Sequence, residues 1–402
     1  MTYPEAIEFL FGLRWHGQKL GLDTMRELLA LLGNPQDRLR FIHIAGTNGK
    51  GSVAAMCHSV LRTAGSRTGL YTSPHLVSFC ERFQINGQMI APDRVMSLVE
   101  RLRPLLTQTT TRPPTFFEVV TAMALVYFQE ENVDVVVWET GLGGRLDATN
   151  VVTPLVSVIT TIGFDHMQYL GDTLASIAGE KAGIIKPGVP VVTGVRDPEA
   201  LRVIHETSSQ RGCRLTEVRE PLDWEIPLAG THQRWNGATA VAALQASGLP
   251  VTMEQMRAGL RQTRWPGRFQ VIRENPTVIL DGAHNGAAAT VLAATMQEQF
   301  PGRPVALILG VLRDKDYAEV CRILAPMARW VFCVPVPSER TCDPAELANH
   351  CRGEMRADLA TAYAEAMTLP VEVILITGSL FLVGEALGLA APGSSARERA
   401  LQ

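Results

Sequence analysis

Short, fully apolar runs alternate with helical segments along most of the chain, and this alternation limits the fold more than any other feature. Runs of this kind are typical of strands buried on both faces, so they predict parallel sheets covered by helices. The first series of predicted strands covers residues 41–45, 133–138 and 155–161, with helices at 52–62 and 117–129. The second series covers residues 278–280, 305–309, 330–334 and 371–376, with helices at 287–299 and 344–350.

Two α/β domains follow from this pattern, because 402 residues are too many for one compact core. The boundary is predicted between residues 266 and 276, where a Trp-Pro-Gly turn precedes the second series. We therefore expect a larger domain over residues 1–270 and a smaller one over 271–402, each with its own mostly parallel sheet.

The charge and cysteine content narrow the classes of partner. A net charge of −3 gives no global basic field, so nucleic acid is not an expected partner. The seven cysteines are scattered without metal-site spacing, which is typical of reduced thiols. The start of the chain lacks the pattern of a signal peptide, and the longest apolar runs have only strand length. We expect a cytoplasmic protein with no membrane partner.

A glycine-rich loop, Gly-Thr-Asn-Gly-Lys-Gly-Ser at residues 46–52, lies between a predicted strand and a predicted helix. Glycines let backbone N–H groups turn toward a phosphate, while the helix N-terminus and Lys50 add positive charge. The strict phosphate-loop pattern is not met, because Gly51 separates Lys50 from Ser52 and Ile44 stands where the first glycine belongs. The predicted nucleotide contacts here are Thr47, Asn48, Gly49, Lys50, Gly51 and Ser52. Taken alone, the loop indicates a nucleotide and no particular reaction.

Glu139 is the clearest candidate ligand for a metal ion. It follows an apolar strand directly and precedes a glycine-rich stretch, so its carboxylate is expected at the edge where α/β sheets bind ligands. Oxygen donors of this kind suit Mg²⁺, which screens the phosphates of ATP. From their own surroundings, Ser73 and His166 are more simply explained as a turn residue and a structural histidine, and the alternative for Lys181 is a solvent-exposed helix lysine.

Several motifs together resemble the folylpolyglutamate synthase/dihydrofolate synthase family, sister enzymes of the Mur peptidoglycan ligases. The longest is Glu-Thr-Gly-Leu-Gly-Gly-Arg-Leu-Asp-Ala-Thr-Asn at 139–150, and it is the most specific. The others, in the order of the family, are 46–52, Tyr-Thr-Ser-Pro-His-Leu at 71–76, His166, Glu-Lys-Ala-Gly at 180–183, Arg268, Asp-Gly-Ala-His-Asn at 281–285 and Asp-Lys-Asp at 314–316. The resemblance implies an N-terminal P-loop ATPase-type domain that also binds the pterin substrate, and a C-terminal Rossmann-like domain.

The resemblance also implies roles for individual residues. Lys50, Lys181 and His166 would be catalytic, and Lys181 would be carbamylated by CO₂. Two Mg²⁺ ions would be held by Ser73, Glu139, His166 and Lys181. ATP would be contacted further by Asn236, Arg268, Asp281 and His284, with the second domain closing over it. The pterin substrate would be bound by Lys19, Leu20, Gly21, Thr115, Phe116, Phe117, Glu118, Leu146, Asp147 and Ala148. Lys19 departs from some bifunctional members, which carry an acid there.

The activity implied by the resemblance is ATP-dependent addition of L-glutamate to dihydropteroate, to a reduced folate, or to both, by a monomer. The reaction would pass through an acyl phosphate and release ADP and phosphate. One alternative is a Mur-type ligase acting on a UDP-sugar, although the phosphate loop begins at residue 46 and leaves no evident extra domain before it. The other is a nucleotide-switch protein of the P-loop class. A requirement of ATP hydrolysis for both a pterin carboxylate and glutamate would distinguish them.

Overall fold

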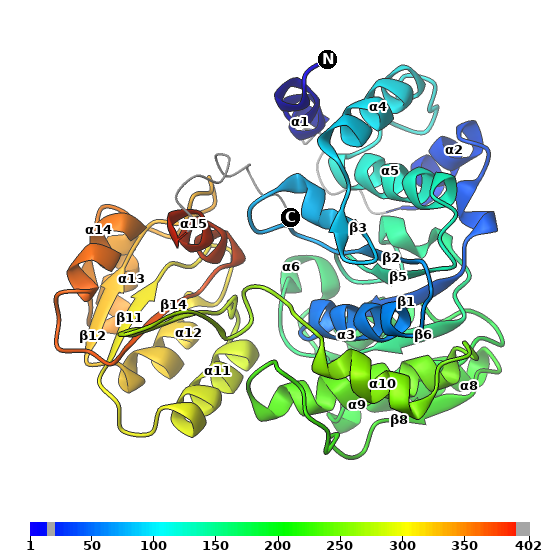
Figure 1. Cartoon of the computed structure of the whole chain (residues 1–402). Coiled ribbons are helices and arrows are strands. Elements are labelled where there is room, and N and C mark those ends of the chain that lie inside the picture. Colours follow the sequence, from blue (N-terminus) through cyan, green and yellow to red (C-terminus); the bar gives the residue numbers. More distant parts are fainter. Residues whose placement is uncertain (14–20, 391–402) are drawn as a thin grey trace.

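The computed structural model describes residues 1–13 and 21–390, which form two α/β units (Figure 1). The first unit contains an eight-stranded sheet in the order β4-β3-β2-β5-β1-β6-β7-β8. Its strands are β1 (Phe41–Ala45), β2 (Thr68–Tyr71), β3 (Phe83–Ile85), β4 (Gln88–Met89), β5 (Val135–Glu139), β6 (Val156–Ile159), β7 (Val191–Thr193) and β8 (Leu215–Glu217). All pairings are parallel except those that β3 makes with β2 and β4.

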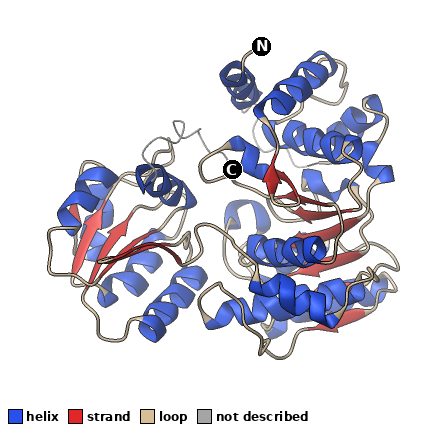
Figure 2. Cartoon of the chain, viewed as in Figure 1, coloured by secondary structure: helices blue, strands red, loops and turns tan. Residues whose placement is uncertain are grey.

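Helices cover both faces of this sheet (Figure 2). One face packs against α1 (Tyr3–Gly12), α2 (Asp23–Leu31), α4 (Pro92–Leu102) and α5 (Phe116–Glu130), and the other against α3 (Lys50–Thr63), α9 (Thr231–Ala246) and α10 (Met253–Arg261). The remaining helices are α6 (Met167–Leu170), α7 (Leu174–Ala182) and α8 (Pro198–Gln210). In β5, Val136 and Trp138 enter the first of these cores, whereas Val135 and Val137 enter the second. Burial of both faces explains why the run has no polar alternation.

The second unit is a six-stranded sheet in the order β13-β12-β11-β14-β10-β9. Its strands are β9 (Gln270–Glu274), β10 (Thr277–Leu280), β11 (Val305–Leu309), β12 (Trp330–Cys333), β13 (Glu354–Met355) and β14 (Val373–Thr377), and only β9 is antiparallel to its neighbour. One face packs on α11 (Gly286–Gln299), α12 (Tyr317–Leu324) and α13 (Pro344–Cys351), and the other on α14 (Leu359–Ala366) and α15 (Leu380–Ala390). The predicted architecture of two mostly parallel sheets is therefore confirmed.

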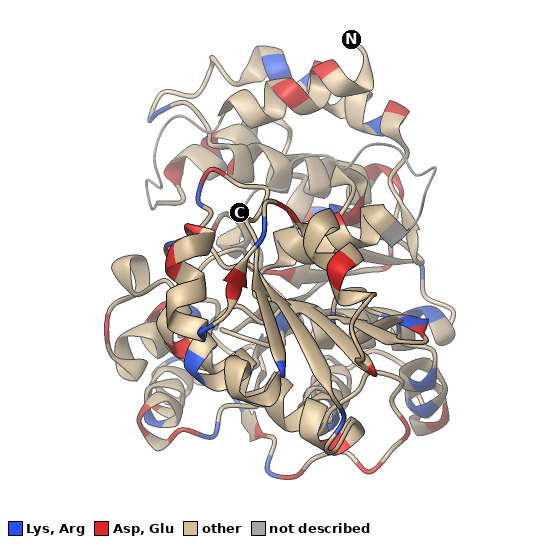
Figure 3. Cartoon of the chain, turned by 90° about the vertical axis from the view of Figure 1, so that its left-hand side faces the viewer, with Lys and Arg blue, Asp and Glu red and all other residues tan. Residues whose placement is uncertain are grey.

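The topology places the predicted functional residues at the carboxyl ends of three central strands of the first sheet. Strand β1 lies between β5 and β6 and runs parallel to both. The strands therefore end side by side. The glycine-rich segment follows β1, Glu139 is the last residue of β5, and residues 160–166 follow β6. Lys, Arg, Asp and Glu positions are interspersed along the elements drawn in Figure 3. Within the described ranges, no helix combines the length and apolar character needed to span a bilayer.

Candidate active site

The phosphate loop is held in shape by contacts with the neighbouring loop. Gly46 and Gly49 have φ of +153° and +86°, and a Cβ on Gly46 would lie 1.8 Å from Thr160 Oγ1. Only glycine fits this approach without strain. The Thr47 amide donates to the carbonyl oxygen of Thr161 over 2.7 Å. The loop is therefore tied to the end of β6 and preformed for an anion at the N-terminus of α3.

Lys50 begins helix α3 and turns its side chain back over the loop. Its ammonium donates to the carbonyl oxygens of Gly46 and Thr47, over 3.1 and 3.3 Å. Both acceptors are neutral carbonyl oxygens that line a cleft, and neither neutralises the ammonium. Its positive charge therefore remains available to a phosphate in the cleft.

A cleft of about 350 Å³ joins the two α/β units. Its lining includes every residue predicted to contact nucleotide or metal: Thr47, Asn48, Gly49, Lys50, Gly51, Ser52, Ser73, Glu139, His166, Lys181, Asn236, Arg268, Asp281 and His284. The structure thus brings together, from both units, side chains that are far apart in the sequence.

Glu139 ends strand β5 with only 4% of its surface exposed. Its Oε2 accepts a hydrogen bond from the Ser73 amide over 3.0 Å. Burial raises the pKa of this carboxyl, although the Lys50 charge and the Ser73 hydrogen bond oppose the rise. No group of three or more His, Cys, Asp or Glu side chains in the described part of the chain could hold a metal. A buried carboxylate beside a serine, open to phosphate oxygens and water, nevertheless fits Mg²⁺, which takes few protein ligands.

Lys181 and His166, the other predicted metal ligands, face different neighbours. Lys181, on α7, is buried and donates to the Gly46 carbonyl oxygen over 3.0 Å. Burial, reinforced by the charge of Lys50, lowers the pKa of Lys181 to about 7. Burial and the nearby charge of Lys315 lower the pKa of His166 to about 4, so its ring is neutral at physiological pH. His166 Nε2 lies 3.1 Å from Lys315 Nζ. The residues as they stand therefore fit one divalent ion better than two.

The loop after β10 is fixed by Asp281. Its Oδ2 accepts from the Phe269 amide and its Oδ1 from the Ala283 amide, each over 2.8 Å. Burial raises the pKa of this carboxyl, with the charge of Arg268 opposing the rise. Both carboxylate oxygens thus accept hydrogen bonds from the backbone, at the residues next to Arg268 and His284. Asp281 therefore holds these two residues at the cleft.

Helix α9 and the segment before the second sheet close against the phosphate loop. A Cβ on Gly49 would lie 2.6 Å from Asn236 Oδ1, and one on Gly51 would lie 2.8 Å from Trp265 Nε1. The Asn236 amide group donates to Gln233 Oε1 over 2.9 Å, which fixes its orientation. These contacts explain why the loop is rich in glycine beyond what a turn requires.

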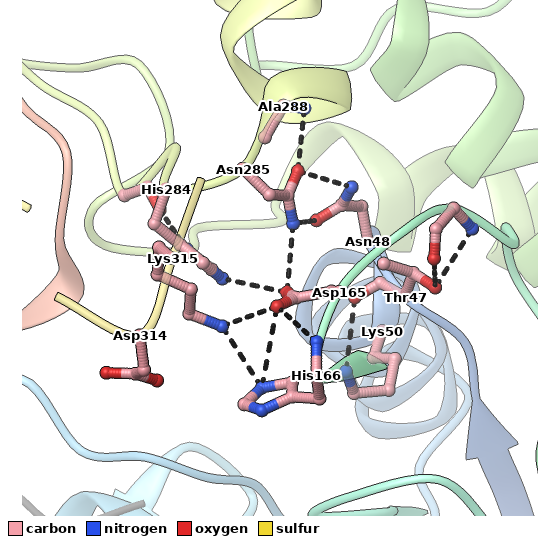
Figure 4. A network of polar contacts seen from close by, with 12 residues as sticks. Thr47, Asn48, Lys50, Asp165, His166, His284, Asn285, Ala288, Asp314 and Lys315 are labelled. Carbon is pink, nitrogen blue, oxygen red and sulfur yellow. Dashed lines mark hydrogen bonds and ion pairs between the residues drawn. The ribbon is translucent and has the colours of Figure 1, made fainter. Parts of the chain in front are cut away.

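Asp165 lies at the centre of a polar network to which the sequence had assigned no role (Figure 4). Lys315 Nζ donates to its Oδ1 over 2.6 Å, and Asn285 Nδ2 donates to its Oδ2 over 3.1 Å. Burial alone would raise the pKa of Asp165, but the nearby His284 ring and the charge of Lys315 hold it well below its usual range. His284, Asn285 and Lys315 fall within the family motifs and Asp165 directly precedes His166, and that signal could have singled them out.

Those predicted pterin-binding residues that the structure describes lie outside the lining of this cleft. Lys19 and Leu20 are outside the described residues, whereas Gly21 is described. Thr115 and Glu118 form a capping box at the start of α5, and Arg112 donates to both oxygens of Glu118 over 2.7 Å each. Phe116 is buried and stacks on Phe11 with ring centroids 5.6 Å apart. These contacts give Thr115, Phe116 and Glu118 structural roles, and pterin binding by them stays a prediction.

The remaining predicted pterin residues shape the loop that follows Glu139. Asp147 accepts hydrogen bonds from the amides of Gly141, Leu142 and Thr149, over 3.1, 2.8 and 3.0 Å. The Phe117 ring lies where a Cβ on Gly141 would fall, 2.5 Å from its Cζ. Beside Asp147, Leu146 is half-buried and Ala148 buried. Asp147 and Phe117 therefore fix the conformation of the loop that follows Glu139.

Residues 44–211 match the Mur ligase middle domain, and residues 267–380 match the Mur ligase glutamate ligase domain. The dihydrofolate synthase/folylpolyglutamate synthase of Bacillus subtilis is 37% identical, over 96% of this chain and 98% of its own length. The solved structure of E. coli FolC in complex with DHPP and ADP has a TM-score of 0.88 at 32% identity, covering 97% of both chains. The bifunctional synthase of Yersinia pestis with AMPPNP and Mn ion has a TM-score of 0.88 at 31% identity, covering 97% of this chain and 98% of its own.

A preformed phosphate loop facing a second α/β unit across a cleft, in a chain built from two Mur ligase domains, defines an ATP-dependent ligase. The extent of the matches is decisive for the subclass, because they cover nearly the whole chain and nearly the whole of each relative. The chain belongs to the folylpolyglutamate synthase/dihydrofolate synthase family.

Proposed function

We propose that the protein joins L-glutamate to the carboxylate of dihydropteroate, of a reduced folate, or of both, with conversion of ATP to ADP and phosphate. The cleft that brings Lys50 and Glu139 of the first domain together with His284 of the second carries this proposal. Relatives named for the same synthase activities support it. We also propose the division into residues 1–270 and 271–402, which lies within one residue of the start of β9, the first strand of the second sheet, at Gln270.

In the proposed reaction, a carboxylate oxygen of the pterin substrate attacks the γ-phosphorus, and the bond to the ADP oxygen breaks. The amine of glutamate then attacks the acyl carbon, phosphate leaves, and an amide remains after loss of protons. Lys50, at the start of α3, would stabilise charge on the transferring phosphoryl oxygens. Mg²⁺ bound by Glu139 and Ser73 would screen the repulsion between phosphate and carboxylate. Closure of the second domain would exclude water from the acyl phosphate.

We propose that Lys181 is carbamylated, because a buried neutral amine can attack CO₂ to give a carbamate and release a proton. Its pKa of about 7 is far below that of a free lysine, so much of the amine is neutral near pH 7. At fixed dissolved CO₂, the modified fraction should rise with pH through this range and fall on acidification. The resulting anion would offset the charge of Lys50 and allow the proposed second metal ion.

Native mass spectrometry under retained CO₂ tests this modification. We expect an added mass of one CO₂ in the wild-type protein and in Lys186→Met, and none in Lys181→Met. Lys186 is the matched control because it is also partly buried, donates to a backbone carbonyl, and has its pKa lowered to about 8 by burial. An unmodified amine in a fully active enzyme would sink the proposal.

The substrate is tested with purified protein, ATP and glutamate, with either dihydropteroate or a reduced folate added. We expect ADP release to depend on glutamate together with at least one of the two pterin carboxylates. Glutamylation of both would establish bifunctionality. ADP release that needs neither substrate would favour a nucleotide switch, and release that needs a UDP-sugar peptide would favour a Mur-type ligase.

We further propose a monomer that works in the cytoplasm. Both sides of the cleft come from one chain, so no second copy is needed to complete it. The seven cysteines are all free thiols, which fits a reducing compartment. Size-exclusion chromatography with light scattering checks the oligomeric state.

A further inference from the structure

A single carboxylate of the first domain receives side chains from two separate loops of the second domain. Asp165 lies in the loop after β6, whereas its partners follow β10 and β11 (Figure 4). From the loop after β10, Asn285 donates to Asp165 Oδ2, and His284 Nε2 lies 3.6 Å from the same oxygen. From the loop after β11, Lys315 donates to Oδ1 over 2.6 Å. The two domains thus converge on one side chain.

The ion pair at the centre of this contact is buried. The side chain of Lys315 is 4% exposed and that of Asp165 is 9% exposed. A charge withdrawn from water is tolerated only when an opposite charge and hydrogen bonds replace its hydration. If the domains separated, water would hydrate both groups. If only Lys315 lost its charge, Asp165 would remain buried without its ion-pair partner, and the closed arrangement would be disfavoured.

The carboxylate is connected to the phosphate loop through its own loop and through Asn285. Within its own loop, the Gly163 amide donates to Thr47 Oγ1, and Thr47 Oγ1 can donate to the Gly163 carbonyl oxygen, over 3.1 Å in each case. Asn285 also bonds Asn48 through the two side-chain amides, at 3.2 Å. A shift of the second domain relative to Asp165 would therefore displace residues 47 and 48 of the phosphate loop.

We propose that the buried ion pair of Lys315 and Asp165 is an interdomain latch that sets the position of the second domain over the phosphate loop. Lys315 is a positioning residue: it acts on the reaction through Asp165 and the loop that carries it. The expected effect on catalysis rests on the proposed function. The contact between the domains does not depend on it.

The test compares Lys315→Met and Lys315→Arg with Arg340→Met in the full-length protein. Arg340 pairs over 3.1 Å with Asp314, the neighbour of Lys315, so its loss removes an adjacent ion pair without touching Asp165. Small-angle X-ray scattering measures the radius of gyration, and steady-state assays measure kcat for ligation and KM for glutamate. Thermal melting of Lys315→Met, Asp165→Asn and the double variant forms a double-mutant cycle, which measures the interaction between the two side chains.

We expect Lys315→Met to increase the radius of gyration and to lower kcat about 100-fold with little change in KM for glutamate, as a small misplacement of reacting groups can do. Lys315→Arg should restore most of both properties, and Arg340→Met should match wild type. The double variant should melt above Lys315→Met, because no carboxylate is left buried without a cation.

Three results would overturn the latch: an unchanged radius of gyration with lower kcat, a raised KM for glutamate with normal scattering, or an expanded protein with normal kcat. The second would mean that Lys315 touches the substrate instead. Failure of the wild-type protein to glutamylate either pterin would refute the proposed function alone, because the scattering and melting differences would still decide the latch.

Discussion

Replacing Lys50 by alanine is expected to lower kcat for ligation by at least about 1,000-fold while the protein stays folded. This loss corresponds to about 4 kcal/mol of transition-state stabilisation. Among the described residues, the ammonium donates hydrogen bonds only to the carbonyl oxygens of Gly46 and Thr47. Both line the cleft, so water can replace the ammonium without leaving a buried charge. Alanine is also a strong helix former for the first turn of α3. Glutamate-dependent ADP release and thermal melting measure the two effects.

Lys186→Ala is the matched control for this prediction. Its ammonium donates to the Asn150 carbonyl oxygen over 3.1 Å in the same domain, outside the lining of the cleft. Its removal should leave kcat within about 3-fold of wild type, because surface and partly buried groups away from a site usually have small effects. Wild-type rates of ADP release in Lys50→Ala would refute the role of Lys50, whereas equal losses in both variants would indicate general destabilisation.

The central strands could be predicted from the sequence because their burial on both faces leaves a strong signal. The predicted run at 41–45 coincides with β1, and that at 305–309 coincides with β11. The run at 133–138 was displaced by two residues at its start, since pairing with β2 begins at Val135, and the strand extends to Glu139, which pairs with Ile44 of β1. The strands β3, β4 and β9, which lie at or next to a sheet edge, were missed, because they are short or largely exposed and have no continuous apolar run.

The site was predictable only where one local motif carries it. The glycine-rich loop and Glu139 each follow an apolar strand directly, so their place at the sheet edge could be inferred. The pairing of Asp165 with Lys315 could not, because 150 positions separate them and no periodicity relates two domains. Thr115 and Glu118 show the opposite case: their spacing is that of a capping box, and this local rule would have predicted their structural contacts.

The charges of the cleft are arranged as a set, which gives Glu139 particular importance. Lys50 and Lys181 both donate to the Gly46 carbonyl oxygen, so two amines converge on one point of the phosphate loop. Glu139 faces them from β5, and Lys50 is the strongest of the charges that oppose the rise of its pKa. An ionised Glu139 is therefore costly to bury but offsets this positive charge. Such a group is more readily explained by function than by stability.

Glu139→Gln is accordingly expected to lower kcat/KM for ligation about 1,000-fold and to weaken binding of Mn²⁺ in the presence of a non-hydrolysable ATP analogue. The amide keeps the shape of the side chain and can still accept from the Ser73 amide, so the fold should persist. Stability should not fall at neutral pH. Because the pKa of Glu139 is raised on folding, the wild-type protein is favoured at low pH and loses that advantage as pH rises through the folded pKa. Glutamine removes this cost.

Glu118→Gln separates loss of a metal ligand from loss of a buried carboxylate. Glu118 is as buried as Glu139, at 4% exposure, but its oxygens accept from Arg112 and the Thr115 amide, outside the lining of the cleft. Its substitution should lower the melting temperature and leave Mn²⁺ affinity unchanged, the reverse of the pattern for Glu139→Gln. Electron paramagnetic resonance of Mn²⁺ and thermal melting across pH distinguish the two. Normal Mn²⁺ binding by Glu139→Gln would exclude Glu139 as a metal ligand and leave its burial to be explained by the charges of Lys50 and Arg268.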